Sequence, residues 1–196
     1  MSFNNTSLNL IPTIIAGWVP NIKQVRSPHF NARPNHEISL LVIHNISLPP
    51  KVFGGEFVES FFLGVLNKEE HPYFSTIGDM KVSSHFLIKR TGKVIQFVSC
   101  LDRAWHAGVS SFWGRKACND FSIGIELEGS DDVMYTTEQY ESLSYLSVAL
   151  MRSYPLITKD RIIGHCHIAP TRKTDPGTSF CWELFMKRII ELEEII

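Results

Sequence analysis

The sequence predicts one layered α/β domain, in which strands and helices are mixed along the chain. Two patterns carry this prediction: short apolar runs or alternations typical of strands, and apolar residues at three- and four-residue steps typical of helices. The length of 196 residues suffices for one substantial domain and does not require a second. The composition, 44% hydrophobic and 20% charged, is ordinary for a globular protein that buries a core.

Five segments have the composition of strands. Residues 39–44 form an apolar run that ends in a histidine, and 84–90 and 93–99 flank Thr91-Gly92, a pair typical of a tight hairpin. The alternation in 121–128 divides its residues between two faces, with Phe121, Ile123, Ile125 and Leu127 on one and Ser122, Gly124, Glu126 and Glu128 on the other. The predicted strands are 39–44, 84–90, 93–99, 121–128 and 161–164.

Helical spacing marks three further segments. A capping box over Thr136–Gln139 precedes leucines and tyrosines at helical steps, which predicts a helix that ends near Pro155. We also expect a short helix over 56–67 and a last one over about 182–194, with Ser179 as its cap. The segment 71–82 is expected to be a polar loop. The Asn-, Pro- and Ser-rich residues 1–37 are expected to form an extended arm over the surface.

Charge and targeting signals exclude several classes of partner. The formal charge of −1, from 19 basic and 20 acidic residues, gives no bulk attraction to nucleic acid or to a membrane surface. No apolar run reaches the roughly 18 residues that a spanning helix needs. Pro12 interrupts the apolar stretch near the N-terminus, and no lysine or arginine precedes it, so we expect a cytosolic protein. The four cysteines lack CxxC spacing and fit reduced thiols.

Polar residues at the ends of two predicted strands form the candidate site. His44 closes the first strand, His165 follows the strand 161–164, and Asp175 comes later on a loop stiffened by two prolines. Two imidazoles and one carboxylate form a common hydrolytic zinc shell that leaves one position open for water. The sequence therefore predicts a zinc ion held by His44, His165 and Asp175. Asp175 could instead be a turn residue that caps backbone N–H groups.

Other histidines compete for these roles. Any one of the eight histidines, taken alone, is more often a surface or core residue than a metal ligand. His167 competes with His165, and we favour His165. His85 and His106 are reserve ligands, although His106 could instead line a cleft together with Trp105.

Three charged residues and one thiol have a catalytic and a plain interpretation. Glu126 is either a general base for zinc-bound water or a solvated strand residue like Glu128. Lys173, two residues before a predicted ligand, either stabilises an oxyanion or is an exposed loop lysine. Arg172 could hold a substrate carboxylate. Cys166 suggests a thiol nucleophile, but sequence neighbours rarely form a working Cys–His pair, so we expect it to be buried beside the ligand strand.

Several long motifs occur in a fixed order along the chain. They are 42–50 (VIHNISLPP), 103–110 (RAWHAGVS), 118–129 (CNDFSIGIELEG) and 164–177 (with GHC, IAP and RKTDPG), and shorter ones are Ser27-Pro28-His29 and His71-Pro72-Tyr73-Phe74. In these motifs the chain resembles the cytoplasmic N-acetyl-anhydromuramyl-L-alanine amidases of the AmpD type. The resemblance covers roughly residues 25–185 and is specific because the motifs are long and ordered.

The resemblance implies a central mixed β-sheet flanked by helices, shared with phage amidase-type lysozymes and peptidoglycan-recognition proteins. It implies an N-terminal arm over 1–24 and a zinc amidase domain over 25–196. The implied zinc ligands are His44, His165 and Asp175, with water activation by Glu126 and transition-state stabilisation by Lys173. Substrate binding is assigned to Asn45, Lys81, Arg115 and Ala169. The implied reaction is hydrolysis of the lactyl–L-alanine amide of (anhydro)muropeptides during peptidoglycan recycling in the bacterial cytoplasm.

This chain departs from the family pattern at three positions. His167 replaces the usual asparagine, and Lys81 and Ala117 stand where arginines are expected, with Arg115 near the second. These changes leave the metal ligands intact but alter the grip on substrate carboxylates, because lysine lacks the bidentate fork of arginine. A peptidoglycan-fragment binding module without catalysis is the alternative function, and an amidase acting on intact wall is a third. Nothing in the sequence indicates a particular oligomeric state.

Overall fold

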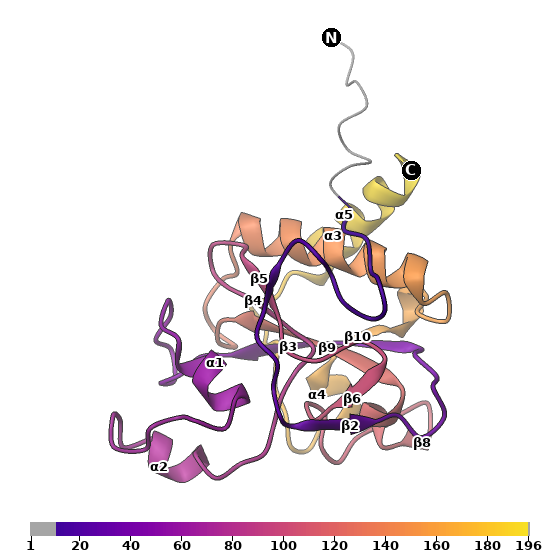
Figure 1. Ribbon diagram of the computed structural model, residues 1–196. Helices are drawn as coiled ribbons and strands as arrows, with labels where there is room; N and C mark the ends of the chain where they lie inside the picture. Colours follow the sequence, from indigo (N-terminus) through magenta and orange to yellow (C-terminus); the bar gives the residue numbers. More distant parts are fainter. Residues whose placement is uncertain (1–10, 196) are drawn as a thin grey trace.

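The computed structural model describes residues 11–195, and a six-stranded mixed sheet forms its centre (Figure 1). The strands of this sheet are β1 (Lys23–Gln24), β3 (Leu40–Ile46), β4 (Phe86–Ile88), β5 (Val94–Gln96), β9 (Ser122–Glu128) and β10 (Ile162–Gly164). Their order across the sheet is β1-β5-β4-β9-β3-β10. The central mixed sheet that the sequence resemblance implies is thus confirmed.

Four of these strands run in the same direction. β3 pairs in parallel with β9 and with β10, and β9 pairs in parallel with β4. β5 runs antiparallel to β4, and the turn between them uses Gly92 at a positive φ of 79°, which confirms the predicted hairpin. Because the carboxyl ends of β3, β9 and β10 meet at one edge, side chains there can be brought together from distant parts of the sequence.

Two long helices cover one face of the sheet. α3 (Thr137–Ser153) and α5 (Trp182–Glu194) lie side by side above the sheet in Figure 1. Ile123, Ile125 and Leu127 of β9 pack beneath them in the main hydrophobic core, as the alternation predicts. Phe121 precedes β9 and packs in a separate cluster with Leu40 and Val42, so its expected place in this row is wrong. Thr136 caps α3 in a complete capping box with Gln139. The expected cap of α5 is wrong: Cys181 holds that position, and the Ser179 hydroxyl donates to the Val133 carbonyl.

Shorter elements cover the other face. They are α1 (Phe57–Phe62), α2 (Phe74–Ile77), α4 (His165–Ile168) and the antiparallel pairs of β2 (Phe30–Ala32) with β6 (Asp102–Ala104) and of β7 (Ser111–Phe112) with β8 (Arg115–Lys116). Because the sheet is covered on both sides, every residue of β9 is buried. The expectation of a solvated Glu128 is therefore wrong. Its carboxylate accepts from the backbone N–H groups of Gly54 and Arg90.

Two segments differ from their predicted form. The helix expected over 56–67 ends at Phe62, and Gly64 follows at a positive φ of 71°, a backbone position that glycine adopts readily after a helix. The polar loop expected over 71–82 contains the short helix α2, whose Phe74 is fully buried. Both helices stand beside the carboxyl-end edge of the sheet, at the left of Figure 1.

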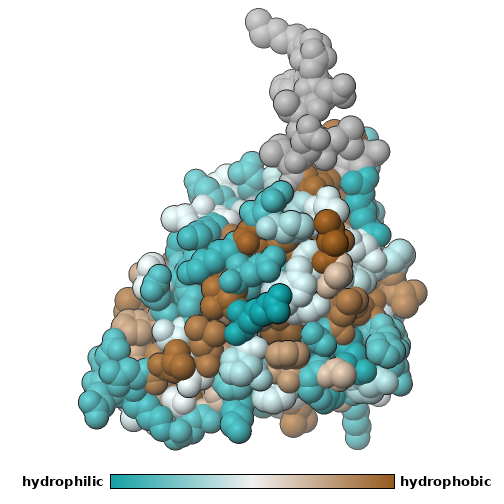
Figure 2. Space-filling view, in the orientation of Figure 1, coloured by the Kyte–Doolittle hydropathy of each residue, from teal (hydrophilic) through white to brown (hydrophobic). Residues whose placement is uncertain are grey.

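The described part of the N-terminal segment is more than a surface arm. β1 adds a parallel strand next to β5, β2 pairs with β6, and Val19 is buried in the main core. The boundary at residue 25 stays a prediction, and residues 1–10 lie outside the described part. Figure 2 shows this side of the molecule, where hydrophobic residues form small separate groups among hydrophilic ones. In residues 11–195, no helix is both long and apolar enough to cross a bilayer.

A candidate metal centre in the cleft

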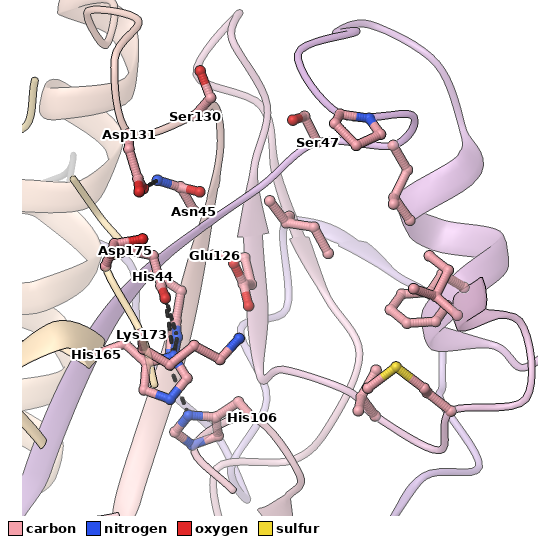
Figure 3. A pocket seen from close by; sticks show the side chains of 18 of the residues that line it. His44, Asn45, Ser47, His106, Glu126, Ser130, Asp131, His165, Lys173 and Asp175 are labelled. Atoms are coloured by element: carbon pink, nitrogen blue, oxygen red, sulfur yellow. Dashed lines mark hydrogen bonds and ion pairs between the residues drawn. The ribbon is translucent and has the colours of Figure 1, made fainter. Parts of the chain in front are cut away.

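The structure brings the three predicted ligands together at the edge of the sheet (Figure 3). His44 Nδ1, His165 Nδ1 and Asp175 Oδ2 are each 3.0 Å from the other two atoms. Strand register explains the meeting of the histidines. Gly164 at the end of β10 pairs with Ile43 of β3, so the next residue, His165, stands beside His44.

The third ligand returns on the loop that follows α4. The Lys173 backbone N–H donates to the Ala169 carbonyl at 3.0 Å, and the Cys166 N–H donates to the Asp175 carbonyl at 2.9 Å. These bonds fold residues 169–175 back over the short helix. The preference for His165 over His167 also follows from α4, because residues two apart on a helix point to nearly opposite sides. His167 lies against Trp182 and away from the other ligands.

The hydrogen bonds around the two rings leave lone pairs at the centre of this cluster. His165 Nε2–H donates to the Ala107 carbonyl at 3.0 Å, and His44 Nε2 lies within hydrogen-bond distance of His106 Nδ1, at 2.9 Å. In the tautomers that keep the proton on Nε2 of each ring, both Nδ1 atoms carry lone pairs directed at the Asp175 carboxylate, as metal binding requires. Three acceptors that converge without a proton repel one another, and a cation between them would remove the repulsion. Ligand atoms on a tetrahedral zinc ion are about 3.3 Å apart, close to the observed spacing.

The reserve ligands His85 and His106 lie behind this centre. His106 Nε2 is hydrogen-bonded to Ser122 Oγ at 3.2 Å, so His106 supports His44 and does not join the three converging atoms. A Cβ built at Gly124 would lie 2.6 Å from the His106 ring, so the glycine provides the space for this ring. His85 Nδ1 accepts from the Gly124 N–H at 3.0 Å.

Burial tunes the ligands for metal binding. The buried environment lowers the pKa of His44 to about 4, so this ring is neutral and able to bind a metal at neutral pH. Burial raises the pKa of Asp175, but in the metal-free protein hydrogen bonds and charge interactions with His165 and His44 outweigh that effect and hold the pKa below its usual range. Asp175 is thus a buried, ionised carboxylate that could hold a metal ion, and not a simple exposed turn residue.

Glu126 stands beside His44 in the next strand, because the register pairs the two residues directly. The side chain is only 8% exposed, so it is not a solvated strand glutamate. Burial, followed by the nearby charge of Asp175, raises the pKa of Glu126 well above its usual value, although Lys173 opposes this. Glu126 Oε2 is buried without a hydrogen-bond partner among the described residues. A carboxylate in this state is suited to exchange a proton with water in the cleft.

Two basic side chains of the ligand loop have different surroundings. The Lys173 ammonium group points into the cleft on the side of Glu126 (Figure 3). Arg172 donates to the carbonyls of Ala107 and Val109 at 2.6 and 2.9 Å, which ties the ligand loop to that segment. Cys166 is partly buried, and its thiol contacts His167 Nδ1 at 3.3 Å.

A cleft with a volume of about 820 Å³ opens beside the three ligands. Its polar side includes the ligands, Asn45, Glu126, Asp131 and Lys173, and the facing side is largely apolar (Figure 3). The apolar residues come from Leu48 and from the region of α1 and α2: Phe61, Phe62, Tyr73, Ile77 and Met80. The cleft therefore suits a ligand with one polar and one apolar side.

The four residues assigned to substrate binding have different positions. Asn45 lines the cleft, and its amide donates to Asp131 Oδ1 at 2.8 Å. Lys81 is exposed between two residues of the lining, Arg115 pairs with Glu37 at 2.6 Å, and Ala169 is buried; these three are outside the cleft lining. Sequence reasoning missed Asp131 and the hydrogen-bonding role of His106. An acidic residue just after the strand of Glu126 is the signal that could have drawn attention to Asp131.

A mixed α/β sheet with this His-His-Asp cluster and a buried glutamate defines a candidate metallohydrolase site. Residues 34–178 match the N-acetylmuramoyl-L-alanine amidase family, and the chain belongs to this family. It is 55% identical over 180 residues to the 1,6-anhydro-N-acetylmuramyl-L-alanine amidase AmpD of Haemophilus influenzae, which covers 91% of this chain and 98% of that protein.

Solved structures agree with this assignment. A crystal structure of a selenomethionine derivative of AmpD matches with a TM-score of 0.88 and 50% identity, over 90% of this chain and 98% of the other. The amidase AmiD of Escherichia coli, solved with the substrate anhydro-N-acetylmuramic acid-L-Ala-D-γ-Glu-L-Lys, matches with a TM-score of 0.56 and 26% identity. That match covers 91% of this chain and 65% of the other.

Proposed function

We propose that this protein is a zinc-dependent amidase that hydrolyses the amide between the lactyl group of an anhydro-muropeptide and L-alanine. One observation carries the proposal: three acceptor atoms at mutual distances of 3.0 Å lie next to a buried carboxylate with an unpartnered oxygen. The names of the relatives support the reaction, since AmpD acts on 1,6-anhydro-N-acetylmuramyl-L-alanine. Peptidoglycan recycling in the bacterial cytoplasm stays a prediction from the same resemblance.

The mechanism assigns a separate task to each side chain. His44, His165 and Asp175 would hold the zinc ion, which when bound supplies Lewis-acid activation of water and of the amide carbonyl. Glu126 takes a proton from the attacking water, because its raised pKa lets the carboxyl group hold that proton in the cleft. Glu126 then returns the proton to the departing alanine nitrogen. The Lys173 ammonium group stabilises the negative charge that develops on the carbonyl oxygen.

The two-sided cleft supports a substrate that joins a sugar to a peptide. The apolar residues near α1 and α2 can contact the face of a sugar ring, and the polar side can bind peptide groups. We keep Asn45, Lys81, Arg115 and Ala169 as proposed binding residues. Of these, Asn45 is the one that lines the cleft, and Arg115 would have to leave Glu37 to bind a substrate carboxylate.

Metal analysis combined with digestion tests this proposal directly. Purified protein is analysed for bound metal and incubated with an anhydro-muropeptide, with and without a chelator, and the products are identified by mass spectrometry. We expect about one zinc per chain, release of the intact peptide stem, and loss of activity on chelation that added zinc restores.

Glu126→Gln is the matched control, because it keeps the shape of the side chain and removes its basicity. This variant should retain zinc and lose at least about 1,000-fold in rate. Near-native turnover in Glu126→Gln would remove this residue from its role. Binding of the muropeptide without any cleavage by the zinc-loaded wild type would support the binding-module alternative.

A further inference from the structure

Asn45 lies at the carboxyl end of β3, directly after the ligand His44, and lines the cleft. Its Nδ2 donates to Asp131 Oδ1 at 2.8 Å. A carboxylate accepts hydrogen bonds and does not donate them, so this contact fixes which end of the amide faces Asp131. Figure 3 shows the result: the amide nitrogen is turned to Asp131, and the amide oxygen points to the opposite side, toward the cleft.

A second contact holds the same amide. The Tyr135 hydroxyl donates to the Pro176 carbonyl at 2.7 Å, so its oxygen is left to accept, and the Asn45 amide is a neighbouring donor. Burial raises the pKa of the Tyr135 phenol above its usual range, which keeps that hydroxyl protonated. The Asn45 amide thus donates to Asp131 and has the Tyr135 oxygen as a second acceptor nearby. Among residues 11–195, no protein group donates to Asn45 Oδ1.

Asp131 is itself held firmly against the ligand loop. The Ser179 N–H donates to the Asp131 carbonyl at 3.1 Å. Gly177, two residues after Asp175, packs so closely that an added Cβ would lie 2.1 Å from Asp131 Cα. The position of the Asp131 carboxylate is therefore set by the same loop that carries a proposed metal ligand.

We propose that Asp131 is a positioning residue: it orients the Asn45 amide so that Asn45 Oδ1 accepts a hydrogen bond from a peptide N–H of the substrate stem. A reversed amide would present N–H groups to that N–H, and the two donors would repel each other. A carbonyl oxygen can only accept a hydrogen bond, and a peptide N–H is the donor that the backbone of the substrate stem supplies. The inference rests on the proposed amidase function and concerns the peptide side of the same cleft.

The test combines variants with altered substrates. Two analogues of an anhydro-muropeptide each have one stem N–H replaced by an ester oxygen, one at the second and one at the third stem residue. We expect wild-type kcat/KM to fall about ten-fold on one analogue, a loss typical of one well-placed hydrogen bond. Asp131→Ala should raise KM for the parent substrate about ten-fold, leave kcat within about two-fold, and cleave the parent and that analogue equally well.

Asp131→Asn is the matched variant, because its side-chain oxygen still accepts from Asn45. It should restore most of the wild-type KM and the preference for the N–H substrate. Tyr135→Phe removes the second acceptor and should weaken this preference several-fold, which keeps the test usable if Asp131→Ala does not fold. Zinc content is measured throughout and should equal that of the wild type.

Several results would overturn the inference. Equal damage in Asp131→Asn and Asp131→Ala would show that the charge matters and the orientation of the amide does not. Loss of zinc in Asp131→Ala would reduce the residue to a structural role, and insensitivity of the wild type to both analogues would remove the peptide N–H contact. If the wild type cleaved no anhydro-muropeptide at all, the proposed function would fail instead, so the two failures are distinguishable.

Discussion

At the scale of single residues, burial holds two ionisable groups of the site away from their usual pKa values. Glu126 has a raised pKa, while His44 has a pKa lowered to about 4. Burial is the main cause of both shifts. Because the unfolded chain lacks these shifts, each one makes the free energy of unfolding depend on pH. The contribution of Glu126 to stability falls as the pH rises, and that of His44 falls as the pH drops, so experiments at different pH values can separate the two.

Glu126→Gln should stabilise the metal-free protein at neutral pH. Because the folded pKa of Glu126 lies above the unfolded value of 4.5, its contribution to stability is greatest below pH 4.5 and is lost as the pH rises toward the folded pKa. The glutamine variant lacks this loss, so we expect it to be more stable than the wild type by about 1–3 kcal/mol at pH 7.5. Urea unfolding at pH 4 and 7.5 measures the difference, which should shrink at the lower pH. An equal gain at both values would contradict the assignment.

Acid should weaken both the metal site and the fold through His44. Its folded pKa of about 4 lies below the unfolded value of 6.5, so the stability that this ring contributes is present above pH 6.5 and lost as the pH falls through about 4. We expect zinc to remain bound near pH 5.5 and to leave steeply around pH 4. Dialysis followed by metal analysis measures the release. A midpoint near pH 6.5 would indicate that the ring is solvated and not buried.

At the scale of elements, one face of β9 positions both the candidate general base and the histidine ring that supports His44. Glu126 reaches the cleft, and Gly124 leaves room for the His106 ring that supports His44. The apolar row of Ile123, Ile125 and Leu127 is predictable from the sequence, because the face of a strand that packs against helices in the core requires apolar side chains. The burial of Glu128 is not, since it depends on the backbone N–H groups of Gly54 and Arg90, which are remote in sequence.

Gly124→Ala should disturb the metal site without removing any ligand. The added methyl group would lie 2.6 Å from His106, so the ring must move and its hydrogen bond with His44 Nε2–H must weaken. We expect about a ten-fold loss of zinc affinity, typical of losing a partner behind a metal ligand. Gly55→Ala is the control, because its Cβ would meet its nearest neighbour at an ordinary 3.5 Å. Equal zinc affinities in the two variants would show that His106 does not support the ligand.

The boundaries of short elements were the least predictable part of the fold. Apolar spacing predicts a helix over 56–67, but α1 ends at Phe62, and Gly64 with its positive φ of 71° is the stop signal in the sequence. The strands β6, β7 and β8 have two or three residues each, too few for a periodic pattern. His165 was expected at a strand end, and the turn into α4 depends on the return of the loop to Asp175.

At the scale of the whole molecule, the candidate centre joins segments that are distant in sequence. β3, β9 and β10 supply or precede His44, Glu126 and His165, and the loop to Asp175 closes the cluster. The sequence motifs and the types of ligand atom predict that these residues hold zinc. Their separations depend on strand order, which the sequence pattern alone does not specify.

A bound ion should therefore stabilise the entire fold. Zinc bound only to the folded state adds about 4 kcal/mol when its free concentration is 1,000 times its dissociation constant. We expect Tm to rise with zinc and to return to the metal-free value on addition of chelator. Asp175→Ala, which removes one ligand, should lose most of this rise. An identical rise in that variant would mean that zinc binds elsewhere.

The register of the central strands separates the parts of this chain that can vary from those that cannot. His165, His44 and Glu126 stand in one row because Gly164 pairs with Ile43 and His44 pairs with Glu126. Deleting one residue within β9 would turn Glu126 toward the helices, since neighbouring strand positions face opposite ways. Insertions between β3 and β4, where α1 and α2 form the far wall, would leave the row untouched. Evolution can thus remodel substrate choice in that wall while the reacting groups keep their alignment.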